Sequence, residues 1–460
     1  MLRDRHPTDK VFEEVLQLIP EMDPRLAKVD EYLGDEALFR LVHEDLSKRW
    51  PKTLVTGRNS TPVEVIERML VVRRLYNLSY EETERQVSDS LILRRFCRVY
   101  LQRVPDDTTL IRAAKLIQPE TLVKFNERVT QLAVKHQVTK RCKLRTDGTV
   151  VETYIHAPSD SWQLADSVQV LARSVERAQK VLGQAGQTGQ ETFQNLQDAA
   201  RRTARQIGQT LKKRTQQAKE AGKQAYRELV EMTQQTVHQA QQALEQLKSQ
   251  TDASAQRLAQ TLQAFIPRAK QVIQQTERRV FQGEAVPNSD KLVSIFEPHT
   301  DIIKREKDRK PVEYGHKVWL NEVDGGIISH YRVLKGNPHD NHQWQPSLEA
   351  HVRTFGRVPE QASGDRGLYS ELNEKAAKDL GVPHVVLPKP GYRSKKREEH
   401  EHQEWFVEGR RWHAGVEGRI SVVKRAHGLE CCRDHGWKGF QCWVGWGIIA
   451  GNLAVMGRTK

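Results

Sequence analysis

The segment KLRTDGTVV, at residues 143–151, decides how the rest of the chain is interpreted. Strand-forming residues lead into Asp147, which is followed by Gly148. An Asp-Gly pair after a strand is usually only a turn. Two further acidic segments give this one more weight: ASGDRGLYS at 362–370, which contains Asp365, and WHAGVEGRISVVK at 412–424, which contains Glu417.

These three acidic residues fall on elements that suit metal chemistry. We expect Asp147 and Asp365 at strand ends and Glu417 on a helix. Carboxylates placed in this way can hold a pair of divalent cations, which clamp the attacking and the leaving oxygen of a phosphodiester displacement. Each residue alone is more often a loop or surface acid, and only their order on these elements carries the prediction. We therefore predict that Asp147, Asp365 and Glu417 are both the catalytic and the metal-binding residues.

The segments around the acids predict an α/β fold. Strand patterns occur at 142–146, 292–296, 318–323, 327–334 and 385–387, and helical spacing occurs at 344–355, 370–380 and 404–425. Asp324-Gly325-Gly326 is a hairpin turn signal between two of these strands. The order is strand, hairpin, helix, strand, helix, strand, helix, which suits a mixed sheet with helices packed on it.

A long proline-free segment separates the first acid from the hairpin. Between residues 159 and 266 there is no proline, Gln and Ala are abundant, and apolar residues step by three and four. This pattern is typical of antiparallel helices, with breaks predicted at Gly183, Gly186 and Gly189 and again at 249–254. A disordered glutamine-rich tract is the alternative. The basic residues of this segment suit either phosphate contacts or a solvated helix face: they are Arg201, Arg202, Arg205, Lys212, Lys213 and Arg214.

The first 138 residues have helical spacing. Ser79 and Glu82 fit a capping box for a helix that follows a tight turn, which is the geometry of a helix-turn-helix. Asp106 is expected to begin a further helix. Arg73 and Arg74 lie in this region and are candidate DNA contacts, although a plain helical bundle with solvated arginines fits equally well. The predicted domains are thus a helical DNA-binding region at 1–138, core segments at 139–158 and 286–460, and a helical insertion at 159–285.

Composition favours a polyanionic partner in a reducing compartment. The chain has 460 residues and a formal net charge of +14, so nucleic acid comes first and an anionic membrane second. The five cysteines do not suggest a disulfide framework, and Cys431, Cys432, His435 and Cys442 lack the paired spacing of a zinc site. The start has no apolar signal core, and the apolar stretch at 442–456 is too short to span a bilayer. We expect a cytoplasmic protein with no membrane partner and a buried helix near the C-terminus.

Two groups of basic residues accompany the proposed acids. On the helix of Glu417, a polar stripe runs beside the buried stripe and contains Arg410, His413 and Lys424, which suits contact with a phosphate backbone. A surface helix with charge pairs is the alternative. The segment KPGYRSKKR at 389–397 is a basic loop with one aromatic residue, suited to holding DNA. Its candidate DNA contacts are Lys389, Arg393, Lys395, Lys396 and Arg397, and a flexible solvated loop is the alternative.

Several motifs taken together resemble those of bacterial insertion-sequence transposases of the DDE class, closest to the ISNCY group. They are PDDTTL at 105–110, LRTDGTVVE at 144–152, SIFEPHTD at 294–301, GDRG at 364–367, the segment 415–429, and WVGWGIIAGNL at 443–453. The resemblance covers nearly the whole chain except the helical insertion. It implies an RNase H-like catalytic core in which Asp147, Asp365 and Glu417 form the triad, with Lys424 as the basic residue two turns after the glutamate. Some related transposases carry Tyr and Arg where this chain has Arg410 and His413, so the role of these two positions is open.

The resemblance also implies the partners and cofactors. Two Mg2+ or Mn2+ ions per active site are expected, as are the inverted repeats of the element itself, a target DNA, and a homodimer or larger complex on DNA. The expected location is the bacterial cytoplasm, with the nucleoid. Three alternatives stay open: a nuclease with the same metal site, a DNA-binding descendant without activity, and a structural coiled-coil protein.

Overall fold

The chain combines α and β structure and divides into two compact units. A computed structural model describes residues 1–7, 9–17, 21–50, 52–57, 59–184, 194–304 and 311–458. The first unit combines Met1–Thr153 with Arg305–Lys460, and the second is Tyr154–Lys304. The second unit therefore interrupts the first, and it begins and ends outside the insertion predicted at 159–285.

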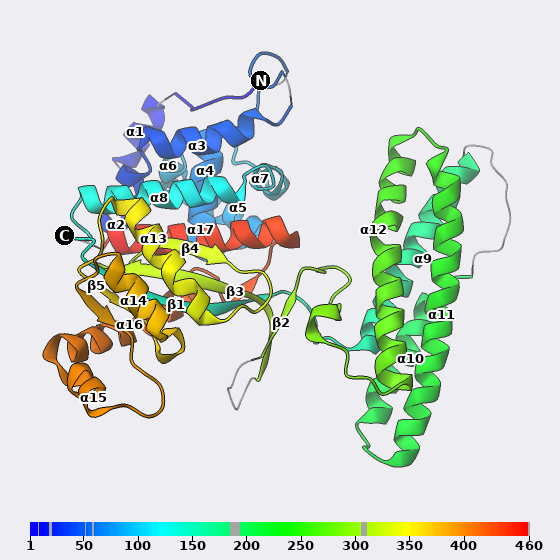
Figure 1. Cartoon of the computed structure of the whole chain (residues 1–460). Helices are drawn as coiled ribbons and strands as arrows, with labels where there is room; N and C mark the ends of the chain where they lie inside the picture. Colours follow the sequence, from blue (N-terminus) through cyan, green and yellow to red (C-terminus); the bar gives the residue numbers. More distant parts are fainter. Residues whose placement is uncertain are drawn as a thin grey trace. The chain divides into compact units, whose positions relative to one another are not determined.

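The N-terminal part of the first unit is helical (Figure 1). Its helices are α1 (Lys10–Leu16), α2 (Pro24–Tyr32), α3 (Glu36–Ser47), α4 (Val63–Leu75), α5 (Tyr80–Asp89), α6 (Leu91–Phe96), α7 (Asp107–Ala114) and α8 (Pro119–Lys135). The predicted capping box is confirmed, because Ser79 and Glu82 bond to each other's backbone N–H groups at the start of α5. Asp106 caps α7 through the N–H of Thr109, as the sequence predicted.

These helices share a hydrophobic core with the C-terminal helix, α17 (Gly436–Met456). Ile66, Met69 and Leu70 of α4 lie in one buried cluster with Trp446 and Leu453 of α17. The N-terminal helices are thus packed into the first unit. The helix α17 is long and apolar enough to cross a membrane by length and composition, and it is longer than the stretch expected from the sequence. It is mostly buried inside the protein, as the sequence predicted, and a core helix passes the same test.

A mixed sheet forms the centre of the first unit. The strands that the first unit contributes to the sheet are β1 (Lys143–Thr153), β3 (Val312–Val323), β4 (Ile327–Val333), β5 (Gln361–Ser363), β6 (His384–Val386) and β7 (Cys431–Cys432). Strand β3 pairs antiparallel with both β1 and β4, whereas β5 pairs parallel with β1 and β6 pairs parallel with β5. The short β7 runs parallel to the end of β1.

The predicted hairpin between β3 and β4 is confirmed. Gly325 and Gly326 adopt φ values of +83° and +78°, which glycine accepts at no steric cost. A side chain at Gly325 would also meet the carbonyl of Val138. The Asp324 carboxylate accepts hydrogen bonds from the backbone N–H groups of Lys140, Cys142 and Lys143, so the hairpin turn holds the entry to β1.

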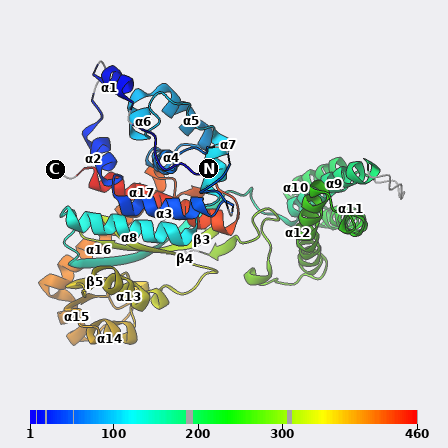
Figure 2. The same ribbon diagram turned by 90° about the horizontal axis from the view of Figure 1, so that it is seen from above.

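Helices cover both faces of this sheet (Figure 2). The remaining helices of the unit are α13 (Trp344–Phe355), α14 (Glu371–Asp379), α15 (Lys395–His402) and α16 (Glu404–Ala426), with short helical turns η3 (Asp340–Gln343) and η4 (Arg366–Leu368). Leu144 and Trp319 pack with Trp344 and Leu348 of α13 on one face. Val151 and Leu320 pack with α16 and α17 on the other.

The second unit is a bundle of long helices (Figure 1). Its elements are α9 (Asp160–Gln184), α10 (Gln197–Leu211), α11 (Gln216–Lys248), α12 (Ala253–Thr276), η1 (Glu277–Phe281), η2 (Asn288–Asp290) and β2 (Asp301–Lys304). Their inward faces form one buried cluster rich in Ala, Leu and Val. The predicted break at 249–254 is confirmed between α11 and α12. Gly183 lies near the end of α9, and Gly186 and Gly189 lie outside the described residues.

The strand predicted at 292–296 is wrong. These residues form an irregular segment whose side chains Leu292 and Ile295 are buried in the core of the helical unit. Glutamine side chains take the place of a neighbouring strand: Gln275 accepts from the N–H of Leu292 at 2.9 Å, and Gln163 accepts from that of Ile295 at 3.1 Å. The strand-like composition therefore reflects burial against helices.

Candidate active site

Asp147 lies in the middle of β1, as its fifth residue, so the expectation that it ends a strand is wrong. Its Oδ1 accepts a hydrogen bond from the N–H of Gly148 at 2.7 Å. A Cβ atom at Gly148 would approach the ring of Trp319 to 2.9 Å, so the DG pair makes room for the indole on the paired strand β3. The Asp147-Gly148 pair therefore lies inside a strand and allows close packing, although an Asp-Gly pair is more often a turn.

Asp365 follows β5 at the strand end, as the sequence predicted. The parallel register pairs Arg145 with Ser363. Asp147 and Asp365 each lie two residues beyond that pair. The register of β1 and β5 therefore places Asp147 on β1 beside Asp365, which follows β5. Adjacent strands lie about 4.8 Å apart. Asp365 also caps η4, because its Oδ1 accepts from the N–H of Leu368 at 3.2 Å.

The helix α16 carries Glu417, and glycines bring this helix close to the sheet. A Cβ at Gly409 would lie 2.5 Å from Val386 of β6, and one at Gly415 would lie 2.6 Å from the guanidinium of Arg145. Arg145 bonds to the carbonyl of Trp412. Side chains alternate along a strand, so Arg145 and Asp147 share the face of β1 on which α16 packs.

The electrostatics of Asp147 and Asp365 reflect burial and neighbouring acids. Burial raises the pKa of Asp147 to about 7, and the charges of Asp365, Asp340 and Glu417 add to that rise, against the hydrogen bond from Gly148. Burial and Asp340 also raise the pKa of Asp365 above its usual value, against hydrogen bonds from Leu368 and Gly367. These shifts indicate that carboxylates from β1, β5, η3 and α16 interact with one another.

Asp340 is a member of this acidic group that the sequence interpretation missed. It begins η3, and its Oδ1 lies 2.7 Å from Nζ of Lys317 on β3. Lys317 also acts on Asp365, whose pKa it lowers. The sequence signal was weak, because Asp340 lies in a polar loop after the hairpin and no strand leads into it.

The donor chemistry of the acidic group suits a hard divalent cation, because carboxylate oxygens are the ligands that Mg2+ takes from proteins. Among the described residues, no group of three or more His, Cys, Asp or Glu side chains lies close enough together to hold a metal ion. Glu417 is exposed. The structure therefore defines no coordination geometry for a metal ion at Asp147, Asp365 and Glu417.

The basic loop predicted at 389–397 is a loop only in its first part, because Lys395, Lys396 and Arg397 begin the helix α15. Arg397 pairs with Glu401 of its own helix at 2.8 Å and with Glu374 of α14 at 2.7 Å, and Arg393 pairs with Glu401 at 3.3 Å. Lys395 and Lys396 are exposed, and Lys389 is half-buried. Tyr392 between them is 90 % exposed, which leaves an aromatic ring in solvent beside these cations.

The predicted basic positions of α16 also differ from one another. Arg410 is exposed and Lys424 is half-buried. Burial, together with the charge of Arg145, lowers the pKa of His413 to about 4, so its imidazole is neutral at physiological pH. His413 therefore brings no positive charge to a phosphate.

Arg73 and Arg74 were predicted as DNA contacts, but both side chains are buried. Arg73 pairs with Asp434 at 3.1 Å. Arg74 donates to the carbonyls of His427 and Trp443 and stacks on the Trp443 ring. Burial lowers the pKa of Arg74 to about 9. These arginines tie α4 to α17 and the segment before it, inside the protein and away from any surface that DNA could reach.

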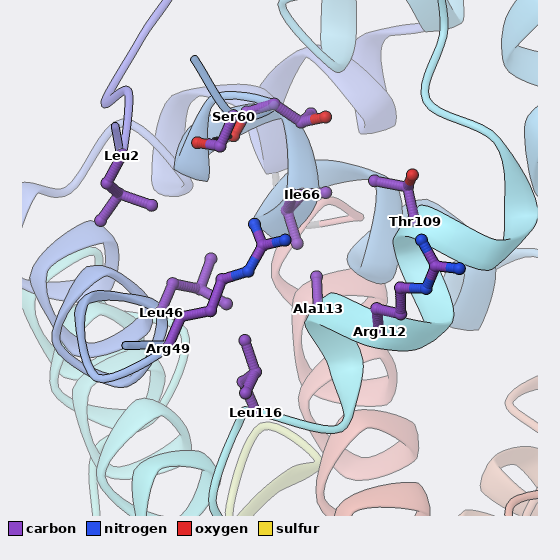
Figure 3. Close-up of a pocket in the computed structure, with 10 residues that line it drawn as sticks. Leu2, Leu46, Arg49, Ser60, Ile66, Thr109, Arg112, Ala113 and Leu116 are labelled. Carbon is purple, nitrogen blue, oxygen red and sulfur yellow. Dashed lines mark hydrogen bonds between the residues drawn. The ribbon is translucent and has the colours of Figure 1, made fainter. Parts of the chain in front are cut away.

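A pocket of about 270 Å³ lies among the N-terminal helices and contains none of the acids (Figure 3). Its lining is mostly apolar, with Leu46, Ile66 and Leu116, and it includes the guanidinium groups of Arg49 and Arg112. This pocket and the acidic group are therefore different places in the fold.

The match to a known protein family falls on the N-terminal helices. Residues 13–116 match the family described as Transposase domain (DUF772). The match supports a transposase family. It spans α2 to α7 and ends before all three predicted catalytic acids. No curated protein and no solved structure matches the chain.

Proposed function

We propose that the chain is a DDE transposase of the ISNCY group, which cleaves DNA at the ends of its own insertion sequence and joins those ends to target DNA. Asp147, Asp365 and Glu417 are the proposed catalytic residues. The observation that carries the proposal is the register of β1 and β5, because it brings two acids that are 218 positions apart in the sequence (365 − 147) to the same level of neighbouring strands.

The sheet supports an RNase H-like core. Two antiparallel pairings, β4 with β3 and β3 with β1, are followed by two parallel pairings, β1 with β5 and β5 with β6. Helices pack on both faces, and α16 brings Glu417 to the face of β1 that carries Asp147. The second unit is then a long insertion between the first strand of that core and its hairpin.

The proposed chemistry assigns separate tasks to the residues. Two Mg2+ or Mn2+ ions, when bound, would activate a water or a DNA 3′-hydroxyl and stabilise the leaving oxygen. The residues that would hold these ions are Asp147, Asp365 and Glu417. Because the pKa of Asp147 is raised to about 7, this carboxyl would release a proton on binding a cation near neutral pH. The exposed cations Lys395, Lys396 and Arg410, with Lys389 and Lys424, hold DNA phosphates near the acids.

The same proposal names the partners and the place of action. The substrates are the inverted repeats of the element and a target DNA, and two ends require two active sites in a homodimer or larger complex. A bacterial cytoplasmic location with the nucleoid follows from these substrates.

The test uses the purified chain, Mg2+ or Mn2+, labelled DNA with the flanking ends of the element, and a target plasmid. Asp365→Asn is expected to lower cleavage and joining by on the order of 10³-fold, since several kcal/mol of transition-state stabilisation depend on the metal site. Asp379→Asn, an exposed acid at the end of α14, is the matched control and should behave as the unchanged chain.

Three outcomes separate the candidates. Joined product that disappears only in Asp365→Asn supports the transposase. Metal-dependent cutting without joining points to a nuclease. Cleavage that persists in Asp365→Asn at the rate of the unchanged chain removes the triad assignment, and DNA binding without cleavage points to an inactive descendant.

A further inference from the structure

The helix α10 and the turn that follows it concentrate the positive charge of the helical unit. Six cations lie in 19 residues, 197–215, together with one acid, Asp198. All six side chains are exposed: Arg201, Arg202, Arg205, Lys212, Lys213 and Arg214. The sequence alone left two interpretations of them, a phosphate-binding surface and a solvated helix face.

The apolar side of α10 is already used. Ala200, Ala204 and Ile207 are buried in the core of the helical unit. At 100° per residue, Arg202 lies opposite the middle of this apolar stripe, and Arg201 and Arg205 lie on one flank, about 90° and 130° away from it. An amphipathic helix that inserts into a membrane needs a free apolar face, and α10 has placed its own apolar face against α9 and α11.

The six cations of α10 and the following turn form no ion pairs among the described residues, whereas some cations elsewhere in this unit do. Lys248 pairs with Glu245, and Arg278 pairs with Glu284. Within the described residues, no ion pair joins any of the six cations to an acid, Asp198 included. An exposed run of like charge without counter-charges produces a local positive field that attracts polyanions.

Arg214 occupies a backbone conformation that disfavours an arginine. Its φ is +54°, in the left-handed region that glycine and asparagine adopt at lower cost. Lys212, Lys213 and Arg214 are three consecutive cations in the turn between α10 and α11. Glycine at position 214 would lower the backbone free energy of this turn, yet the chain has an arginine there. Such an outlier is a reason to look for a role of the side chain itself.

We propose that α10 and the following turn, residues 201–214, bind the phosphate backbone of duplex DNA without reading its sequence. The choice of DNA as the partner rests on the proposed transposase function. Arg201 and Lys212 are separated by about 16 Å along the helix at 1.5 Å per residue. This span exceeds the width of the major groove, about 12 Å, so the two basic clusters can reach phosphates on opposite sides of one groove.

The test measures how DNA affinity depends on salt. The full chain and its triple variant Arg201→Gln, Arg202→Gln, Arg205→Gln are titrated with a fluorescent 30-base-pair duplex of unrelated sequence, without divalent metal, across a range of salt concentrations. Each lost phosphate contact reduces the slope of log K against log salt by about 0.9. The triple variant should reduce it by about 2.7, and Kd should rise by on the order of 10²-fold at low salt.

A matched control removes the same charge elsewhere on the unit. Arg173, Arg177 and Lys180 are exposed on α9, with Glu176 among them. Their replacement by Gln should leave the slope unchanged. An equal loss of slope in both triple variants, or no loss in the α10 variant, overturns the proposal. Binding to phosphatidylserine vesicles that depends on the same arginines, with DNA affinity unaffected, also overturns it.

Arg214→Gly provides a variant that does not endanger the fold. Glycine relieves the backbone cost at φ +54°, so the unfolding temperature should stay the same or rise. The slope should nevertheless fall by about 0.9. These binding assays need no catalysis. If Asp365→Asn failed to abolish cleavage, the proposed chemistry would be rejected, while the salt dependence of DNA binding would still test this surface separately.

Discussion

The helical unit and the sheet unit bury different kinds of polar group. The helical unit buries mainly hydroxyl and amide side chains, such as Thr233 and Gln275. The sheet unit buries many charged ones, among them Glu67, Arg74 and Glu322. The Thr233 hydroxyl donates to the carbonyl of Leu229 in its own helix, and the Gln275 amide bonds to Leu292 and Asp160 of the same unit. A buried charge costs more free energy than these neutral groups unless it is paired. The comparison predicts that the sheet unit is the pH-sensitive and packing-sensitive part.

The largest expected difference concerns Glu67 on α4. Burial raises the pKa of Glu67 to about 8, from an unfolded value near 4.5. The folded chain then holds this proton between pH 4.5 and 8, while the unfolded chain has lost it, so stability falls as pH rises through that window. At pH 9 the buried Glu67 carboxyl lowers the free energy of unfolding, and Glu67→Gln should recover on the order of several kcal/mol of it.

Calorimetry at pH 6 and pH 9 measures this effect. The transition of the sheet unit should move to lower temperature at pH 9 in the unchanged chain and move less in Glu67→Gln. The helical unit should keep its transition temperature at both pH values. Equal pH dependence in the unchanged chain and in Glu67→Gln would show that Glu67 is ionised without cost.

A smaller effect is expected where α16 meets the sheet. Gly409→Ala places a methyl group 2.5 Å from the Val386 side chain and should destabilise the sheet unit by about 1–3 kcal/mol. Gly418→Ala is the control on the same helix, because no atom lies within 4 Å of its new Cβ. It should stabilise by about 0.5–1 kcal/mol. Urea unfolding of the two variants checks the pair, and opposite signs are the required result.

The smallest effect tests the helical unit. Gly208 lies within α10, and a Cβ there meets no atom within 4 Å. Gly208→Ala should therefore raise the stability of this unit by about 0.5–1 kcal/mol and leave the sheet unit unchanged. Thermal melts followed by circular dichroism would detect it. Destabilisation by Gly208→Ala would mean that α10 packs more tightly than its open surroundings indicate.

Local signals predicted much of the secondary structure. The capping box at Ser79, the Asp324-Gly325-Gly326 turn and the helix at 344–355 depend on neighbours within a few residues, and all three are confirmed. The apolar spacing in the insertion likewise predicted its helices, because each helix buries a stripe with its own period.

The features that could not be predicted from the sequence depend on contacts between residues that are far apart in the chain. The segment at Leu292 looked like a strand, but Gln163 and Gln275 from α9 and α12 bond its backbone. Arg73 looked like a surface cation, but Asp434, which is 361 positions away, lies beside it. Asp340 joined the acidic group only because η3 packs against η4, the turn that Asp365 begins after β5. Each depends on which elements become neighbours, and local pattern carries no such information.

The most direct test of the proposed active site is Asp147→Asn, measured for metal-dependent DNA cleavage and for thermal unfolding at pH 8. Asparagine removes a buried charge that burial, Asp365, Asp340 and Glu417 all disfavour, so the unfolding temperature should stay the same or rise. Cleavage should be lost by on the order of 10³-fold in the same sample. A folded Asp147→Asn chain that cleaves as fast as the unchanged chain would contradict the claim that these carboxylates form the active site.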